Sequence, residues 1–228
     1  MTVDPAESET DHRAAPGVYE TRFADRAVVD KLAAWVEIGR FLQRWVDPDK
    51  PILDVGCDAG YFIRNIAGSE RWATDIRDVS SQLPGEVRFV QANGLELDQR
   101  VPTDHFGTVF MSNYLEHLMS QAEVIEQLRV VERLLAPGGR VVILQPNVRL
   151  TGGSYWDFID HRVPLTERSL VEAARLAGLR PVRLITRFLP YTSTGRLPQW
   201  PPLVRLYLAL PFAWRLFGQQ TLLVAVRV

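Results

Sequence analysis

The stretch ILDVGCDAGYF, residues 52–62, decides the fold of this 228-residue chain. Residues Ile52 to Val55 are of the strand-forming type and run into a turn that contains Gly56 and Gly60, after which the sequence is compatible with a helix. Glycines let the backbone of such a turn approach a ligand closely, and the N–H groups of a following helix face the same ligand. The stretch therefore predicts a ligand-binding turn at the end of a buried strand.

An acidic residue follows this turn at a spacing that suits a nucleoside. Asp75 stands 21 residues after Asp54 and closes the next predicted strand, where its carboxylate can accept both hydroxyl groups of a ribose. The turn differs from the dinucleotide pattern G-x-G-x-x-G, because Asp58 lies midway between Gly56 and Gly60. A carboxylate there repels a pyrophosphate, so Asp54 and Asp58 favour a cofactor that carries an ammonium and a sulfonium group.

Short runs of strand-forming residues alternate with segments compatible with helices along much of the chain. Seven strands are predicted, at 52–55, 71–75, 87–91, 107–112, 140–145, 182–186 and 221–228. The clearest helix is expected over residues 121–136, and another over 166–176 with Thr166 as its N-cap. This alternation predicts an α/β fold with a doubly wound, mostly parallel sheet and helices on both faces. Ligands bind such sheets at the carboxyl ends of the strands.

Composition suggests how the chain is organised. Residues 1–16 are polar and acidic and are expected to form a disordered tail, whereas residues 17–228 have the length of a single domain. Residues 187–220 form a long aromatic insertion before the last strand. No apolar run is long enough to span a membrane and the acidic amino terminus is unlike a signal peptide, so a cytoplasmic protein is expected. The only cysteine is Cys57, which excludes an internal disulfide.

The net charge of −1 conceals an uneven distribution along the chain. Residues 162–228 hold ten arginines against Glu167 and Glu172, a net charge of +8, which leaves −9 for residues 1–161. Such a split favours an anionic partner near the carboxyl-terminal third, unless the arginines form only a scattered solvated face. Nucleic acid is not expected as a partner, because the chain has only two lysines and a sequence pI near 6.4.

Several motifs resemble those of the class I S-adenosylmethionine-dependent methyltransferases, whose first motif reads L-D-V-G-C-G-x-G. Residues 53–60 match it except that Asp58 replaces the middle glycine, and further matches follow at 72–75, 89–93, 110–118 and 134–143. The resemblance implies a Rossmann-like methyltransferase fold whose last strand runs antiparallel, and S-adenosylmethionine as cofactor. It also implies that residues 17–46 form a helical lid over that cofactor.

Site residues follow from the resemblance position by position. Eight residues are expected to bind the cofactor: Asp54, Gly56 and Gly60 at the methionine part, Asp75 at the ribose, Ile76 and Asn93 at the adenine, Asn113 near the sulfonium, and Asp58, which departs from the family motif, through the attraction of its charge for a cationic cofactor. Asn93 stands where many family members have Asp, and its amide oxygen can still accept a hydrogen bond from the adenine amino group. Ile76 can equally belong to the core, and Asn113 can be a turn residue.

Methyl transfer from a sulfonium is an in-line displacement, so alignment of the acceptor supplies most of the acceleration. A hydroxyl acceptor gains from a base, and His161 and His117 are the candidates because neutral imidazole takes up a proton near pH 7. We favour His161, because it lies in a loop rich in aromatic and charged residues that packing explains less easily. The predicted reaction is methyl transfer to a hydroxyl of a small molecule, such as a sugar or secondary metabolite. N- or C-methylation of a small or lipid-linked acceptor and a non-catalytic cofactor-binding or scaffolding subunit are the alternatives.

Aromatic residues and metal ligands complete the predicted site. Tyr19, Trp156 and Tyr191 are expected to contact the acceptor. Glu116 and His117 match part of a magnesium site in some ubiquinone-pathway O-methyltransferases that the sequence resembles. No metal is expected, because Asn113 replaces one carboxylate of that site and a hard cation prefers several oxygen ligands.

Residues 203–217 are too apolar for a solvated helix and too short to span a bilayer. One hypothesis is that they pack on the sheet as part of the acceptor pocket or a homodimer seam. The other is that they dock on an anionic membrane surface and present a lipid-linked acceptor.

Overall fold

The computed structural model describes residues 25–191 and 200–228. Its strands are β1 (Ile52–Val55), β2 (Arg71–Asp75), β3 (Val87–Gln91), β4 (Phe106–Ser112), β5 (Leu135–Pro146), β6 (Leu179–Ile185) and β7 (Gln220–Arg227). Its α-helices are α2 (Asp25–Leu42), α3 (Gln121–Leu134), α4 (Val148–Thr151), α5 (Glu167–Leu176), α6 (Pro201–Ala209) and α7 (Pro211–Phe217). The tail predicted over residues 1–16 and Tyr19 lie outside the described residues.

The strands form a seven-stranded sheet in the order β3-β2-β1-β4-β5-β7-β6. Neighbours from β3 to β5 run parallel, and β7 runs antiparallel to both β5 and β6. The predicted α/β class and the antiparallel last strand are confirmed. The strand order reverses between β1 and β4, so the crevice outside their carboxyl ends is the place where this sheet type binds ligands.

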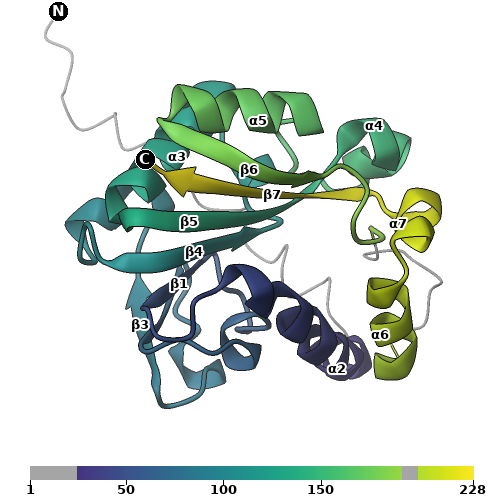
Figure 1. The fold of residues 1–228 in the computed structure, drawn as a ribbon, viewed down its shortest axis with the longest axis horizontal. Helices are drawn as coiled ribbons and strands as arrows, with labels where there is room; N and C mark the ends of the chain where they lie inside the picture. Colours follow the sequence, from purple (N-terminus) through teal and green to yellow (C-terminus); the bar gives the residue numbers. More distant parts are fainter. Residues whose placement is uncertain (1–24, 192–199) are drawn as a thin grey trace, which may run out of the picture.

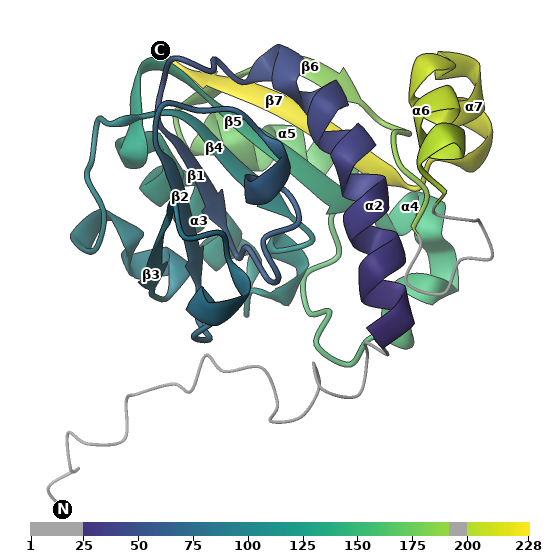
Figure 2. The same cartoon turned by 90° about the horizontal axis from the view of Figure 1, so that it is seen from below.

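Helices cover both faces of the sheet, as Figures 1 and 2 show. On one face, Val124, Leu128 and Val131 of α3 and Leu170 of α5 enter one apolar cluster with β4 and β5. On the other face, α2, α6 and α7 share a second cluster with β1 and β7. The side chain of Thr166 accepts a hydrogen bond from the Ser169 N–H and begins α5, as predicted.

The segments after β1, β2 and β3 form only short 3-10 helices, η3 (Ile63–Asn65), η4 (Ser80–Gln82) and η5 (Gly94–Gln99), although an α-helix is expected after the glycine turn. Only seven residues, 61–67, lie between Gly60 and Gly68, which is less than two turns of an α-helix. Arg64 also donates to the carbonyls of Ala59 and Gln82, which ties this connection to the next one. The prediction of an α-helix after the glycine turn is therefore wrong, because this segment forms a short 3-10 helix.

The aromatic insertion forms two short helices in its described part. Proline at 211 interrupts residues 203–217, so that α6 and α7 follow one another without forming one continuous helix. Trp214 packs edge-on against Phe41 of α2 and against Phe188, with ring centroids 5.6 and 5.4 Å apart. The Nη2 and Nε atoms of Arg205 donate hydrogen bonds of 2.7 and 3.0 Å to the carboxylate of the buried Glu37. This bidentate pair connects α6 to α2. Within residues 25–191 and 200–228, no helix is long and apolar enough to cross a membrane.

Candidate active site

The glycine turn after β1 is built from three residues in the left-handed region, Gly56, Asp58 and Gly60, with φ of 67°, 48° and 69°. A side chain at position 56 would come within 2.6 Å of the Tyr114 ring, so this position requires glycine for space as well as for φ. Asp58 holds its conformation because its N–H donates to the Asp75 carboxylate at 3.0 Å. The departure from the family motif therefore leaves the turn intact and links it to β2.

Three carboxylates converge at this turn. Asp54 and Asp75 are buried at 3% and 7% exposure, and Asp58 is half-buried. Arg77 lies between two of them: its Nε donates to Asp75 at 3.1 Å and its Nη2 to Asp58 at 3.0 Å. Burial, together with the charges of Asp75 and Asp58, raises the pKa of Asp54 to about 8 against the lowering effect of a backbone hydrogen bond. A cationic ligand beside Asp54 would lower the pKa of this carboxyl and favour its ionised form.

The raised pKa of Asp54 predicts a stability that falls as pH rises. Between about pH 4 and 8 the folded state holds a proton that the unfolded state has lost, so the free energy of unfolding decreases by up to about 1.4 kcal/mol per pH unit from this group. In Asp54→Asn this dependence should disappear, and the variant should be more stable than the parent at pH 8. Urea unfolding of both proteins at pH 5.5 and pH 8 measures the difference. If the free energy of unfolding changed equally with pH in the two proteins, the raised pKa would not belong to Asp54.

The other expected cofactor residues lie at the ends of neighbouring strands. Ile76 follows β2 and is 41% exposed, so it is not a core residue and can offer an apolar surface to a ring. Asn93 follows β3, but its side-chain oxygen accepts from the Leu95 N–H at 3.1 Å and caps η5. Asn113 follows β4, is exposed and has φ 48°, so it is also a turn residue. The eight predicted residues thus all lie at the carboxyl ends of β1, β2, β3 and β4.

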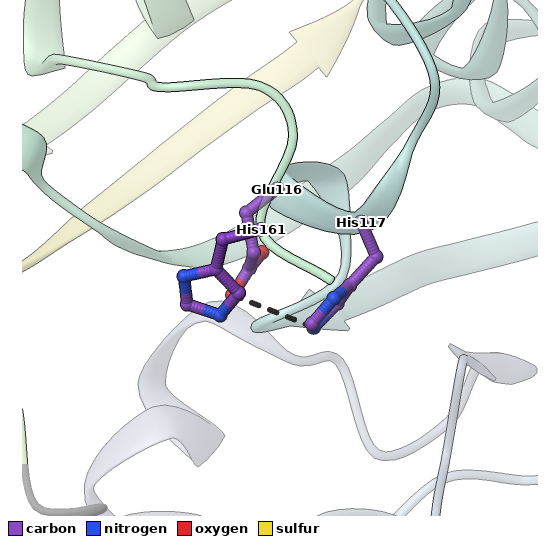
Figure 3. A group of neighbouring side chains, drawn as sticks. All are labelled: Glu116, His117 and His161. Carbon is purple, nitrogen blue, oxygen red and sulfur yellow. Dashed lines mark ion pairs between the residues drawn. The ribbon is translucent and has the colours of Figure 1, made fainter. Parts of the chain in front are cut away.

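Two loops bring the predicted catalytic histidines together. His117 belongs to η6 (Leu115–His117) after β4, and His161 to the segment after β5; their ring centroids lie 5.1 Å apart (Figure 3). The Nδ1 atom of His161 lies 2.8 Å from the Tyr155 carbonyl oxygen. Because a carbonyl only accepts hydrogen bonds, this nitrogen carries the proton and Nε2 is the basic nitrogen of neutral His161.

His117 has the surroundings of an oriented base. Its Nδ1 lies 3.2 Å from the Asp160 carbonyl oxygen and 3.3 Å from the Asp160 carboxylate, and its Nε2 lies 3.9 Å from the Glu116 carboxylate. Burial alone lowers the pKa of His117, but the hydrogen bond to Asp160 and the charges of Glu116 and Asp160 outweigh it, so the pKa is raised. The sequence places Asp160 beside His161, yet in the fold its carboxylate pairs with His117. Sequence reasoning missed this pair, since 43 residues separate its members.

Glu116 completes the cluster. It is fully buried, and burial raises its pKa. One carboxylate oxygen accepts a hydrogen bond of 3.0 Å from Gln145, whereas the other has no hydrogen-bond partner among the described residues. Donor atoms of Glu116, His117 and His161 lie within 4.8 Å of one another, so these three residues could hold a divalent metal ion.

The aromatic residues expected to contact an acceptor differ in their positions. Tyr191 lies 6.4 Å from the His161 ring and 6.0 Å from the Phe158 ring, centroid to centroid, which brings it to the histidine cluster. Trp156 is 55% exposed and packs edge-on against Tyr155. Tyr191, which belongs to the aromatic insertion, therefore lies at the histidine cluster, whereas Trp156 is connected to His161 through Tyr155.

Comparisons with known proteins agree with this geometry. The family model for a methyltransferase domain matches residues 27–184. A search of curated protein sequences gives no significant match. Among solved structures, a SAM-dependent methyltransferase from Archaeoglobus fulgidus superimposes with a TM-score of 0.61 at 18% identity, over 83% of this chain and 93% of that one. The putative methyltransferase solved with the Trm112 activator of Haloferax volcanii gives 0.65 at 16% identity, over 92% and 95%.

A third similar structure is the geranyl diphosphate C-methyltransferase of Streptomyces coelicolor, solved with Mg²⁺, geranyl diphosphate and S-adenosyl-L-homocysteine. It has a TM-score of 0.57 at 17% to 18% identity, over 86% of this chain and 76% to 79% of that one. At these identities the superpositions establish the fold, whereas the match to the family model covers more than half of the chain. The chain therefore belongs to the methyltransferase domain family. Its cofactor is S-adenosylmethionine.

Proposed function

We propose that the protein transfers the methyl group of S-adenosylmethionine to a hydroxyl group of a small-molecule acceptor. The observation that carries the proposal is the histidine pair at the carboxyl end of β4, next to the strand that bears the glycine turn. A hydroxyl must lose its proton during methyl transfer, so a base beside the cofactor is useful for an oxygen acceptor. The three carboxylates of the turn suit the cationic cofactor.

His117 is the better candidate for the base, although the sequence favours His161. His117 is 26% exposed, whereas His161 is 7% exposed. Asp160 orients the His117 ring through Nδ1, which leaves Nε2 to take up the proton, the arrangement in which a third group positions the base. His161 and Tyr191 then line the acceptor side of the cluster. Carbon or nitrogen methylation is the rival reaction, and one structural neighbour is a C-methyltransferase.

The identity of the methylated atom tests the proposal. The purified protein is incubated with ¹³C-methyl S-adenosylmethionine and a metabolite and lipid extract of its source, and the labelled products are examined by NMR. We expect the methyl carbon to be bonded to oxygen. A label on carbon or nitrogen would contradict the oxygen assignment and leave the methyltransferase assignment standing. Absence of cofactor binding at millimolar concentration in calorimetry would contradict the cofactor itself.

A further inference from the structure

The helices α6 and α7 carry large apolar side chains that point away from the core. Six of them, which we call the outer apolar face, are between 39% and 66% exposed: Trp200, Leu203, Leu206, Phe212, Leu216 and Phe217. Trp200, at the N-cap of α6, is followed by Leu203 and Leu206 at intervals of three residues, and Phe212 and Leu216 lie four residues apart on α7, so each helix presents an outward apolar side. Figures 1 and 2 show both helices at one end of the molecule, outside α2. So much exposed apolar surface in one place marks an interaction site.

The two helices that carry the outer apolar face are themselves well packed against the core. Leu208 and Trp214 are buried in the core on the inner side of the two helices. The Tyr207 hydroxyl donates to the Phe188 carbonyl at 2.5 Å, and the Trp214 ring N–H donates to the Tyr207 carbonyl at 2.9 Å. The outer side chains therefore do not result from a loosely packed segment, and polar substitutions there leave the core intact.

The outer apolar face lies at the same edge of the sheet as the candidate active site. α7 leads into β7, which starts opposite Pro146 at the carboxyl end of β5. Gln219, between α7 and β7, accepts a hydrogen bond from the Tyr191 N–H and donates to the Leu150 carbonyl. Tyr191 in turn packs near His161. Gln219, two residues after the end of α7, is thus linked through Tyr191 to the histidine cluster.

The exposed arginines beside the outer apolar face indicate which kind of partner binds there. Arg215 stands on α7 between Phe212 and Leu216, is exposed and forms no ion pair with the described residues. Arg187 is also exposed and lies at the end of α7, where its guanidinium donates to the Gly218 carbonyl. A second copy docked through a two-fold axis would bring Arg187 and Arg215 close to the same residues of its partner, which is unfavourable. An anionic bilayer complements both features, because Trp and Phe insert at the headgroup level while arginines remain with the phosphates.

We propose that the outer apolar face docks on an anionic membrane surface, and that the acceptor hydroxyl belongs to a lipid or lipid-linked molecule presented at that surface. The docking stands independently of the reaction, whereas the acceptor class rests on the proposed function. The two helices lie in the interfacial region without crossing the bilayer, since they have nine and seven residues.

Vesicle flotation tests the docking. The full chain is mixed with vesicles of phosphatidylcholine alone, or with a third of phosphatidylglycerol, at low and high salt. We expect binding to the anionic vesicles, weaker binding at high salt, and a loss of about tenfold or more in the double variant Phe212→Ser/Leu216→Ser. Leu176→Ser is the matched control, because Leu176 is 56% exposed at the end of α5 and should not change binding.

Two results would overturn the docking: no flotation of the parent chain with anionic vesicles at low salt, or equal flotation of the double variant. A concentration-dependent dimer that the double variant abolishes, without vesicle binding, would assign the face to a second copy of the chain. Calorimetry with S-adenosylmethionine on the same variants keeps the two proposals apart. Their cofactor affinity should equal that of the parent; failure of cofactor binding in the parent would contradict the proposed function and the acceptor class that rests on it, whereas the docking would stand.

Discussion

Replacement of His117 by Gln is expected to lower kcat for methyl transfer by about 10² or more, with little change in the affinity for S-adenosylmethionine. The glutamine amide keeps polarity and approximate size but cannot accept a proton from the acceptor hydroxyl. Turnover at saturating acceptor, measured beside calorimetry for the cofactor, separates the two quantities. His105→Gln is the matched control: His105 is half-buried near Glu70, just before β4 at the opposite edge of the sheet, and its replacement should leave kcat unchanged.

The pH profile distinguishes a base from a residue that only fills space. Since the pKa of His117 is raised above its ordinary value of 6.5, kcat should rise as pH increases through that higher value and the ring loses its proton. In Asp160→Asn one of the two carboxylate charges that raise the pKa of His117 is gone, so the rising limb should move to lower pH while part of the activity remains. An unchanged limb in this variant would show that Asp160 does not act through His117.

Parallel measurements on His161→Gln and on metal-free enzyme decide between the remaining arrangements. A loss of about 10² in His161→Gln with only a few-fold loss in His117→Gln would assign the base to His161. Activity lost on chelation and restored by a divalent ion would make both histidines ligands; we expect activity to survive chelation, because one carboxylate and two histidines suit a hard cation poorly. If neither substitution lowers kcat by more than a few-fold, alignment of the acceptor with the methyl group alone accounts for catalysis. The proposal of an oxygen acceptor then loses its main support.

The cofactor half of the site could be predicted because its interactions are local. Asp54, Asp58 and Asp75 lie within one strand–turn–strand unit, and the parallel pairing of β1 with β2 brings their carboxylates together without any information from the rest of the chain. The strands were predictable for a similar reason, since runs of apolar and β-branched residues such as Ile52–Val55 are buried on both faces of a parallel sheet.

The acceptor half depends on contacts between distant segments. His117 and Asp160 meet because two loops leave the same edge of the sheet after β4 and β5, and no spacing in the sequence records which carboxylate faces which histidine. Helix boundaries shift for similar reasons. The helix expected to run to residue 136 ends at Leu134, because Leu135 already pairs with Phe106 as part of β5. Tertiary pairing here overrides a local helical pattern.

Replacement of Asp75 by Ala is expected to weaken the binding of S-adenosylmethionine by about 10- to 150-fold, which corresponds to about 1.5–3 kcal/mol for hydrogen bonds to a charged group. Two cofactor hydroxyl groups would lose their acceptor, and Arg77 would lose one of the two carboxylates that it binds. Calorimetry with the cofactor and with its demethylated product measures the loss. Since Asp75 also accepts from the Asp58 N–H, part of the effect reflects the glycine turn, and circular dichroism with urea unfolding shows whether the fold persists.

The matched control for Asp75 is Asp78→Ala, which removes an equal charge three residues away. Asp78 is exposed, and its carboxylate accepts from the N–H and the hydroxyl of Ser80, so it has no part in the glycine turn. Its removal should change cofactor affinity less than twofold, because an exposed charge is screened by solvent and salt. Equal losses in the two variants would mean that Asp75 acts only through general electrostatic attraction. An unchanged affinity in Asp75→Ala would remove it from the cofactor site, because the contact at the end of β2 would then be unnecessary for binding.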